Sequence, residues 1–234
     1  MKIYKIVKNI LDKALAIILI ILFAIPMFII SIAIKKEDGG PIIYKSKRMG
    51  KDMKIFNTYK FRSMKENREE LHSNLSHEEM VTKVGKFIRK TSLDELPQLF
   101  NIIKGEMSFI GPRPWIPEYY EWFTTEQKRR VDVLPGISGL AQVKGRNGIN
   151  IFKKVDYDLQ YVDNMSFKQD LKLIFLTIKA VFSKDNAEIT ENGIKQEINE
   201  LMLQNKVEEA KYKPVINELN IQNEMEEASY KQAI

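Results

Sequence analysis

The longest apolar pattern in the chain lies near its N-terminus. Residues 14–34 contain no charged side chain, and a helix needs about 20 apolar residues to cross a bilayer. A buried helix of a soluble protein seldom runs this far without one polar face. A secretory signal is the competing interpretation, but this run is too long for one, and the residues that follow it form a poor cleavage site. We therefore predict a membrane-associated helix over residues 1–36.

Pro26 lies near the middle of this run, where a proline kinks or breaks a helix. The run alone is compatible with two topologies. It could span the bilayer as a kinked helix, or it could enter one leaflet, turn and leave on the same side. The positive-inside rule does not decide between them, because lysines flank both ends of the run: Lys5, Lys8, Lys13, Lys35 and Lys36.

The segment after the apolar run has the pattern of β-structure. Residues 42–47 and 54–61 look like two strands, and residues 49–52 supply a turn between them, so we predict a β-hairpin. Lys60 and Arg62 stand two residues apart at the end of the second strand, and a period of two places them on one face. An exposed charged face is the simpler interpretation of these two cations taken alone.

Two later segments have helical periodicity. Residues 96–103 are apolar at helical spacing, and residues 167–182 form an amphipathic helix that packs on the domain or lies on the membrane. Residues 115–130 interleave aromatic and basic side chains, which suits a lipid headgroup layer as well as a packed core. The patterns together predict an α+β fold, mainly helical, with a small β-hairpin and amphipathic interfacial helices.

Composition narrows the class of protein. A chain of 234 residues is one ordinary domain with extra segments, and 44% hydrophobic residues are enough for a core. The absence of cysteine excludes disulfides and thiolate metal sites, and two histidines argue against a histidine zinc site. A bound metal would therefore have oxygen ligands, which favours Mg²⁺ or Mn²⁺.

The net charge of +6 is unevenly distributed. Ten Glu and five Lys beyond residue 186 leave that tail at −5 and the rest of the chain at +11. A basic body indicates an anionic partner, such as a membrane surface, a phosphorylated substrate or a nucleic acid. No nucleic-acid-binding module is recognisable, so we expect no nucleic acid partner. The tail, residues 186–234, is compatible with disorder, or with helices that pair in a homo-oligomer.

Residues 90–114 concentrate the candidate chemistry. Asp94 and Glu95 are adjacent acids, and Ser92 stands three residues before Glu95, as in a helix capping box. This spacing predicts Asp94 in the first turn of a helix, beside unpaired N–H groups that also suit a phosphate. Acids are common in a first turn, so a cap alone is the simpler interpretation. Because Arg89 and Lys90 lie just ahead, we expect a lowered pKa and an ionised Asp94.

Two further segments supply cations. Residues 111–114 form a rigid Gly-Pro-Arg-Pro turn that contains Arg113. Residues 136–148 are rich in glycine, which lets a backbone approach a ligand closely, and they include Arg146 and Asn147. This segment matches neither the P-loop nor the dinucleotide-binding fingerprint, so it is a weak phosphate signal by itself.

Several long motifs occur in a fixed order behind the apolar helix. They are YKFRSM at 59–64, SLDELPQL at 92–99, GEMSFIGPRP at 105–114, PGISGLAQ at 135–142 and GRN at 145–147. Over residues 1–185 the chain resembles the bacterial sugar transferases, that is, the monotopic phosphoglycosyl transferases. It resembles most the small members, and among them those that use a diacetylbacillosamine donor.

The resemblance implies an activity and a location. Such enzymes move a sugar 1-phosphate from a UDP-sugar to undecaprenyl phosphate and release UMP. The helix of residues 1–36 would be re-entrant and broken at Pro26. Residues 37–185 would form a catalytic domain on the cytoplasmic side of the bacterial inner membrane, and the tail lies outside the resemblance.

The resemblance also implies roles for particular residues. Asp94 would be the nucleophile that forms a phosphosugar–aspartyl intermediate. Glu95 would be the acid associated with Mg²⁺, so that Asp94 and Glu95 together form the metal site. The expected substrate-binding residues are Lys60, Arg89, Arg113, Arg146 and Asn147.

A second class of function explains part of the sequence. A non-catalytic, membrane-anchored basic scaffold that recruits anionic partners would account for the apolar helix and the +11 body. It would not account for the acid pair, the Gly-Pro-Arg-Pro turn and the glycine-rich segment in their order. Release of UMP that depends on a UDP-sugar would separate the enzyme from the scaffold.

Overall fold

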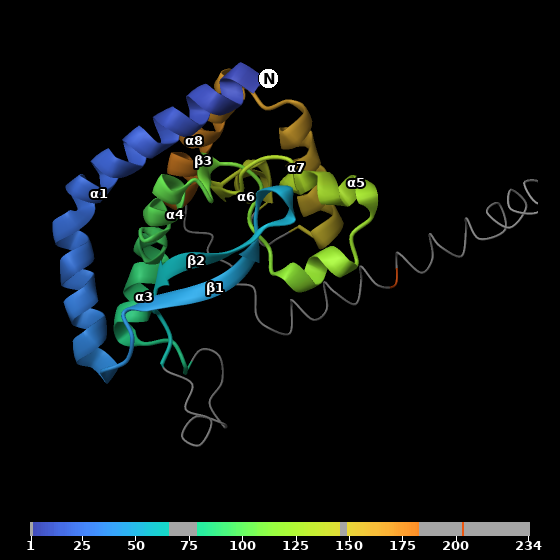
Figure 1. Cartoon of the computed structure of the whole chain (residues 1–234). Coiled ribbons are helices and arrows are strands. Elements are labelled where there is room, and N and C mark those ends of the chain that lie inside the picture. Colours follow the sequence, from blue (N-terminus) through green and yellow to red (C-terminus); the bar gives the residue numbers. More distant parts are fainter. Residues whose placement is uncertain (1, 66–78, 146–148, 183–202, 204–234) are drawn as a thin grey trace, which may run out of the picture.

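The computed structural model describes residues 2–65, 79–145, 149–182 and 203. Within these residues the fold is α+β and mainly helical, as predicted (Figure 1). The predictions for Arg146 and Asn147, and those for the tail apart from Leu203, lie outside the described residues.

The N-terminal apolar run forms one long helix at the edge of the molecule. Helix α1 extends from Lys2 to Asp38 and contains Pro26. The predicted break is a bend, because α1 stays helical across the proline and changes direction along its length (Figure 1). Proline is the residue in such a run that accounts for a bend, since it lacks the N–H that would bond the carbonyl four residues earlier. Among the described residues, α1 is the single helix long and apolar enough to cross a membrane.

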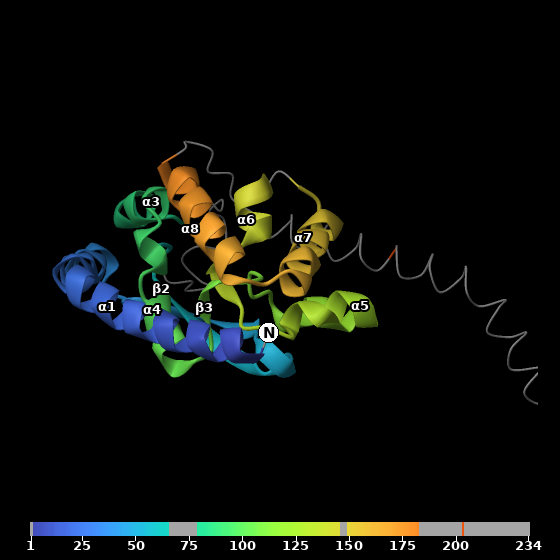
Figure 2. The ribbon, with the colours of Figure 1, turned by 90° about the horizontal axis from the view of Figure 1, so that it is seen from above.

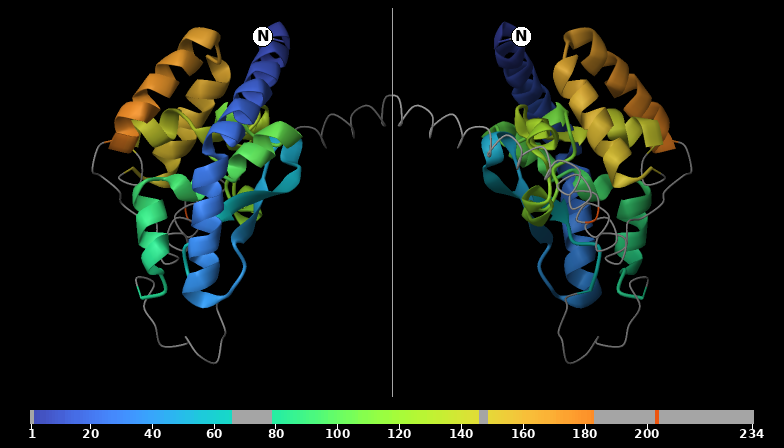
Figure 3. Two further views of the ribbon diagram at one scale, coloured as in Figure 1. Left: turned by 90° about the vertical axis from the view of Figure 1, so that its left-hand side faces the viewer. Right: turned by 90° about the vertical axis from the view of Figure 1, so that its right-hand side faces the viewer.

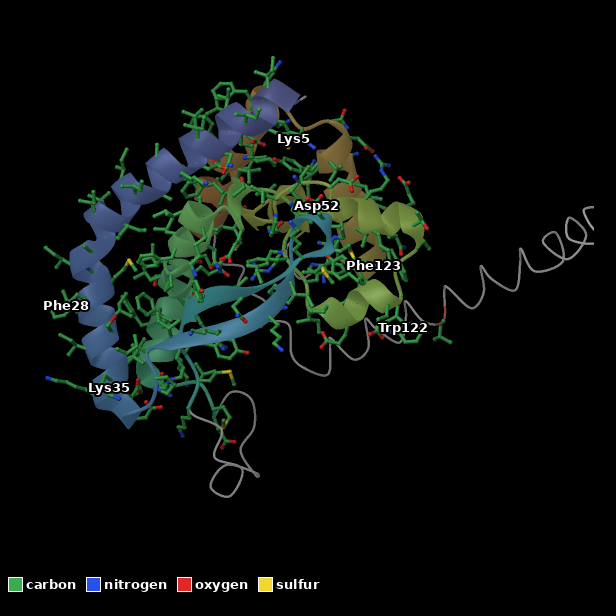
Figure 4. The ribbon with its side chains drawn as sticks, viewed as in Figure 1. Lys5, Phe28, Lys35, Asp52, Trp122 and Phe123 are labelled. Carbon is green, nitrogen blue, oxygen red and sulfur yellow. The ribbon has the colours of Figure 1, made fainter. Side chains whose placement is uncertain are left out.

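Helix α1 buries one stripe and exposes the rest. Ala16, Ile30 and Ile34 pack inward on the domain. Large apolar side chains on the other faces are exposed, and Phe28, which points away from the domain in Figure 4, is 65% exposed. An apolar surface of this size is not stable in water, so the exposed faces of α1 fit a lipid environment.

The first turns of α1 are tied to the domain by polar contacts. Tyr4 and Lys8 both contact the carboxylate of Asp170 at 2.6 Å, and Ser108 donates a hydrogen bond to Asp12 at 2.6 Å. Ser108 and Asp170 lie far from α1 in the sequence, 96 residues after Asp12 and 166 residues after Tyr4. The N-terminal end of α1 therefore has a fixed position on the domain.

The last turn of α1 is tied to the same domain. The Glu37 carboxylate accepts hydrogen bonds from the backbone N–H groups of Lys83 and Val84, and Asp38 forms an ion pair with Arg62. Arg62 is 7% exposed. Both ends of α1 thus contact one body, and the side view in Figure 3 shows the helix running across that body.

The predicted β-hairpin is confirmed. Strands β1 (Ile43–Met49) and β2 (Ile55–Phe61) pair antiparallel with Ile43 opposite Phe61, and the 3₁₀ helix η1 (Lys51–Met53) connects them. Directly opposite residues share a face, so Tyr44 and Lys60 lie on the same side of the hairpin as the pair Arg48 and Phe56.

Helices α3 (Lys83–Lys90) and α4 (Gln98–Lys104) lie between α1 and the hairpin (Figure 1). The 3₁₀ helix η2 (Leu93–Glu95) joins them. Leu99 and Ile102 of α4 pack with Ala16 of α1. The segment with the two acids is therefore enclosed by the membrane helix on one side and the hairpin on the other.

A second, parallel pair of strands was not predicted. Strand β3 (Ser108–Ile110) pairs with β4 (Gly136–Ser138), and each has three residues. A Cβ atom on Gly136 would lie 2.2 Å from the backbone nitrogen of Gly111. Gly136 therefore allows two segments of this chain to approach each other closely, and not a segment to approach a ligand.

The remaining elements complete the domain. Helix α8 (Phe167–Phe182) packs against α6 (Leu140–Gly145) and the β3–β4 pair, with α7 (Ile151–Asp163) on the far side of α6 (Figure 2). The aromatic segment before them contains η3 (Pro117–Glu121), α5 (Thr125–Lys128) and η4 (Arg129–Val131). Its Tyr119, Tyr120 and Phe123 are buried in a cluster with Met49 and Ile151, so this segment belongs to the core.

Candidate active site

The predicted capping box at the acid pair is wrong. Ser92 has φ +56° and makes no side-chain cap hydrogen bond. Residues Leu93–Glu95 form one turn of 3₁₀ helix, and α4 begins at Gln98 behind Pro97. The box does not form because Ser92 has a left-handed conformation instead of the extended one of an N-cap, and Glu95 accepts hydrogen bonds from Lys60 and Arg113 instead. Asp94 therefore lies in a single 3₁₀ turn and not in the first turn of α4.

Glu95 is the fixed member of the acid pair. Its Oε1 atom accepts hydrogen bonds from Lys60 Nζ at 2.6 Å and from the Arg113 guanidinium at 3.1 Å. Burial opposes ionisation of Glu95, but the charges and hydrogen bonds of Lys60 and Arg113 outweigh it and lower the pKa to about 2. Glu95 is therefore an ionised carboxylate that brings β2 and the Gly-Pro-Arg-Pro turn together.

Asp94 is in a different state from its neighbour. Its Oδ2 atom lies 3.9 Å from Lys60 Nζ, its side chain is 13% exposed, and no described residue donates a hydrogen bond to it. Burial raises the Asp94 pKa, and the charge of Glu95 adds to the rise, while Lys60, Arg89 and Arg113 oppose it. The predicted lowering of this pKa is wrong, because the sequence shows the nearby cations but not the loss of solvent.

Lys60 is positioned by a buried amide. Asn101 of α4 is fully buried, accepts a hydrogen bond from Tyr59 N–H at 3.1 Å and donates one to the Asn57 carbonyl at 2.7 Å. This clamp fixes β2 against α4, so that Lys60 reaches the acids. Lys60 and Arg62, which were expected on one face, have different partners. Lys60 contacts the two acids, and Arg62 pairs with Asp38 of α1.

Arg89 approaches the acids from α3. Its Nε donates to the Ser63 hydroxyl at 2.8 Å, and its charge opposes the raised pKa of Asp94. Lys90 is exposed and is not among the groups that shift the Asp94 pKa. The structure thus brings together five predicted residues: Asp94, Glu95, Lys60, Arg89 and Arg113.

Arg113 is held from behind by a buried arginine. Arg130 is 2% exposed and donates to the Arg113 carbonyl at 2.7 Å and to the Tyr120 hydroxyl at 2.7 Å. Its guanidinium also contacts Asp158 at 2.5 Å and lies 4.1 Å from the centre of the Trp115 ring. The sequence left the segment of residues 115–130 open between a lipid-facing surface and the core; the structure places Arg130 in the core, where it contacts the backbone of Arg113.

The acid pair fits a divalent cation that also contacts substrate. Mg²⁺ is commonly bound by one or two carboxylates together with substrate phosphates and water. Asp94 lacks a hydrogen-bond donor among the described residues, and both cations that contact Glu95 use Oε1, which leaves Oε2 available. The described residues contain no group of three potential metal ligands, so substrate oxygens would have to complete the coordination.

The comparisons with known proteins identify the family. The profile of the bacterial sugar transferase family matches residues 3–184. The chain belongs to this family and is a transferase. It is 40% identical to the "Uncharacterized sugar transferase EpsL" of Bacillus subtilis over 185 residues, which cover 79% of this chain and 92% of that relative.

Two longer relatives are each similar over about three quarters of the chain. Identity is 38% to the "Undecaprenyl-phosphate galactose phosphotransferase" of Salmonella typhimurium, over 73% of this chain and 39% of the relative. It is also 38% to the "UDP-glucose:undecaprenyl-phosphate glucose-1-phosphate transferase" of Klebsiella pneumoniae, over 77% of this chain and 41% of that relative. The chain therefore spans about two fifths of these two proteins. The expected diacetylbacillosamine donor stays a prediction.

Proposed function

We propose that this protein transfers a sugar 1-phosphate from a UDP-sugar to undecaprenyl phosphate and releases UMP, as the first membrane step of a glycan assembly. The observation on which the proposal depends most is Asp94, a half-buried acid with no hydrogen-bond donor among the described residues, beside a second acid that two cations hold. The printed names of the Salmonella and Klebsiella relatives support the acceptor and the class of donor.

The proposed reaction proceeds by two displacements at one phosphorus. An Asp94 carboxylate oxygen attacks the β-phosphorus, the bond from that phosphorus to the bridging oxygen breaks, and UMP leaves with the electron pair. An oxygen of undecaprenyl phosphate then attacks the same phosphorus. The Asp94–phosphorus bond breaks, which restores the carboxylate and leaves the sugar on a polyprenyl diphosphate.

The remaining site residues neutralise charge. Phosphoryl transfer between anions depends mainly on positioning and electrostatic stabilisation. Lys60 and Arg113 reach the acids directly, and Arg89 acts on Asp94 through its charge. Asp94 and Glu95 would hold Mg²⁺, which would supply further positive charge to the phosphate oxygens.

The attachment of α1 at both ends supports a re-entrant topology. Its first turns contact Asp170 and Ser108, and its last turn contacts Lys83 and Arg62. A straight spanning helix would separate its ends by the hydrocarbon core, about 30 Å thick. We therefore propose that α1 enters and leaves the cytoplasmic leaflet of the inner membrane. The exposed Phe167 and Phe175 on α8 support an interfacial position for that helix.

The first test measures UMP release. We expect the purified full chain in detergent, with Mg²⁺ and undecaprenyl phosphate, to release UMP from one member of a panel of UDP-sugars. Asp94→Asn should lower this rate by roughly a thousandfold or more, because it removes the nucleophile. Asp52→Asn, on the exposed connection of the hairpin (Figure 4), is the matched control and should keep the wild-type rate.

Membrane association separates loss of chemistry from loss of folding. Asp94→Asn protein should float with vesicles as the wild type does, since α1 is unchanged. Near-normal UMP release by this variant would contradict the proposed nucleophile. No UMP release by folded wild-type protein from any UDP-sugar in the panel would contradict the proposed function.

A further inference from the structure

One cation on the inner face of the hairpin has no role in the site described so far. Arg48 follows Tyr44 and Ser46 along β1 on the face that also contains Lys60. Lys45 and Lys47 point to the opposite face and are exposed, whereas Ser46 and Arg48 are half-buried. Arg48 stands four residues beyond the partner of Lys60, roughly 13 Å along the strand. The face that delivers Lys60 to the acids therefore continues to Arg48.

The backbone brings Arg48 next to the Gly-Pro-Arg-Pro turn. Met49 N–H donates to the Trp115 carbonyl at 2.9 Å, which joins the end of β1 to the chain just after Arg113. Met49 is buried on the opposite face from Arg48. The Arg113 guanidinium is close enough to lower the Arg48 pKa, together with burial, which is the larger cause.

Arg48 differs from its neighbours in lacking a counter-charge. Arg113 pairs with Glu95, and Arg130 pairs with Asp158. No described residue forms an ion pair or a hydrogen bond with the Arg48 guanidinium; Glu118, Tyr44 and Tyr119 act on it only through weaker electrostatic effects. A half-buried guanidinium beside a second one is unfavourable until an anion lies between them. The planar forks of two arginines suit phosphate oxygens.

The position of this pair selects one phosphate of the donor. Lys60 Nζ lies 3.9 Å from Asp94 Oδ2 and Arg113 reaches the adjacent Glu95, whereas Arg48 stands roughly 13 Å along the strand from the position opposite Lys60. Arg48 is therefore farther from Asp94 than Arg113 is. In a bound diphosphate, the phosphorus under attack lies at Asp94, so the other phosphate extends past Arg113.

We propose that Arg48 and Arg113 form a binding site for a phosphate group, and that in the donor this group is the α-phosphate, which leaves in UMP. The inference rests on the proposed function for the identity of the donor. The acceptor lipid also presents a phosphate, so the chemistry of the site is shared and the experiment must separate the two sources. Arg48 holds the leaving phosphate, and it takes no part in bond formation at Asp94.

The test compares UMP with uridine as calorimetric ligands of the full chain in detergent. The ratio of their two Kd values isolates the contribution of the phosphate. We expect Arg48→Gln to lower UMP affinity about tenfold or more through lost charge-assisted hydrogen bonds and to leave uridine affinity unchanged. Lys47→Gln, which removes the neighbouring charge on the exposed face, should leave both within about twofold. Arg48→Lys keeps the charge but loses the fork, and should lie between these two.

Steady-state kinetics identify which phosphate uses the site. In Arg48→Gln, the KM for the UDP-sugar should rise and the KM for undecaprenyl phosphate should stay at the wild-type value. A rise in the lipid KM with unchanged UMP affinity would overturn the assignment to the nucleotide. If the ratio of the UMP and uridine Kd values in Arg48→Gln equals that of the wild type, the phosphate site itself is overturned. If thermal melting shows that this variant does not fold, a wild-type ratio in Arg48→Lys overturns the site instead.

Failure of the proposed function gives a different result. Wild-type protein that binds UMP more tightly than uridine, with Arg48 required, but releases no UMP from UDP-sugars would retain the phosphate site and contradict the transferase reaction. Wild-type protein that releases UMP while Arg48→Gln keeps its UMP affinity would retain the reaction and contradict the site. Wild-type protein that binds UMP no better than uridine would also contradict the site.

Discussion

Two adjacent carboxyl groups with opposite pKa shifts define the centre of the site. Glu95 accepts hydrogen bonds from Lys60 and Arg113, so its pKa falls to about 2. Asp94 loses solvent without gaining a donor among the described residues, so its pKa rises. Neighbouring acids whose environments separate their pKa values commonly have different roles in a reaction. Here Glu95 is a counter-ion of two cations, and Asp94 accepts no hydrogen bond within the described residues, as the proposed nucleophile requires.

The raised Asp94 pKa predicts a pH dependence that one substitution should shift. In the proposed mechanism Asp94 must be ionised to act as the nucleophile, so kcat/KM should fall on the acid side as Asp94 is protonated. Lys60 lowers the Asp94 pKa. Lys60→Met should therefore raise that pKa further and move the acid limb of the kcat/KM profile to higher pH, beside any loss of rate. Lys45→Met, on the exposed face of β1, is the control, and an acid limb that stays in place or moves to lower pH would contradict this account.

At this scale the sequence predicted which residues would come together but not their environments. The motifs point to Asp94, Glu95, Lys60, Arg89 and Arg113, and the structure brings all five together. The predicted cap at Ser92 and the predicted pKa shift of Asp94 are wrong for one reason. Both depend on which groups lose water and which partners reach them from other elements, and a sequence pattern does not contain that information. Arg48 had no signal beyond membership of a basic strand.

At the scale of elements, the Gly-Pro-Arg-Pro turn is rigid because two layers hold it. In front, Arg113 reaches Glu95. Behind, Arg130 holds the Arg113 carbonyl and pairs with Asp158 on α7. Arg130 and Asp158 are 28 residues apart, and both are almost fully buried. The orientation of Arg113 thus depends on α7, a helix from which no side chain contacts the two acids.

This arrangement predicts a large loss of stability from one conservative change. Asp158→Asn leaves the Arg130 charge buried without its partner, which should lower the free energy of unfolding by roughly 3–5 kcal/mol. The measurement is urea unfolding followed by tryptophan fluorescence, because Trp115 lies against the Arg130 guanidinium. Asp156→Asn, an exposed position on the same helix, is the matched control. A loss of less than about 1 kcal/mol in Asp158→Asn would contradict the role of the pair.

Elements with a long repeat were predictable, and short ones were not. The apolar run predicted α1, and the alternation around a turn predicted the β1–β2 hairpin. Strands β3 and β4 have three residues each, too few for a period to show. The alternation of aromatic and basic residues around Arg130 did not decide between surface and core, because its buried partner Asp158 lies on a separate helix. The resemblance implied a break at Pro26, but α1 remains helical across that residue.

At the scale of the whole molecule, α1 is an apolar helix whose two ends make polar contacts with the rest of the domain. The Tyr4–Lys8 end contacts Asp170, and the Glu37–Asp38 end contacts α3 and Arg62. The apolar faces between them are exposed. This combination favours one-sided insertion, since both sets of polar contacts must form in the aqueous phase.

One-sided insertion can be tested by chemical labelling, because the chain has no cysteine of its own. Ile3→Cys and Lys36→Cys place single thiols at exposed positions near the two ends of α1. A membrane-impermeant maleimide should label both thiols in inverted membrane vesicles and neither in intact spheroplasts. Asp52→Cys in the domain should behave in the same way as both. Labelling of one α1 end in spheroplasts would show a spanning helix.

The polar contacts of α1 also set an order of events during biosynthesis. Helix α1 is translated before the other described elements. Asp170, whose carboxylate contacts Tyr4 and Lys8, is translated 132 residues after Asp38. At about 5–20 residues per second, α1 waits on the order of 10 s for this partner. During that interval Tyr4 and Lys8 lack their Asp170 partner, although Lys8 can already pair with Asp12 within α1 and Asp38 can pair with Arg62. The final seating of α1 in the membrane is therefore a late step, completed when α8 has left the ribosome.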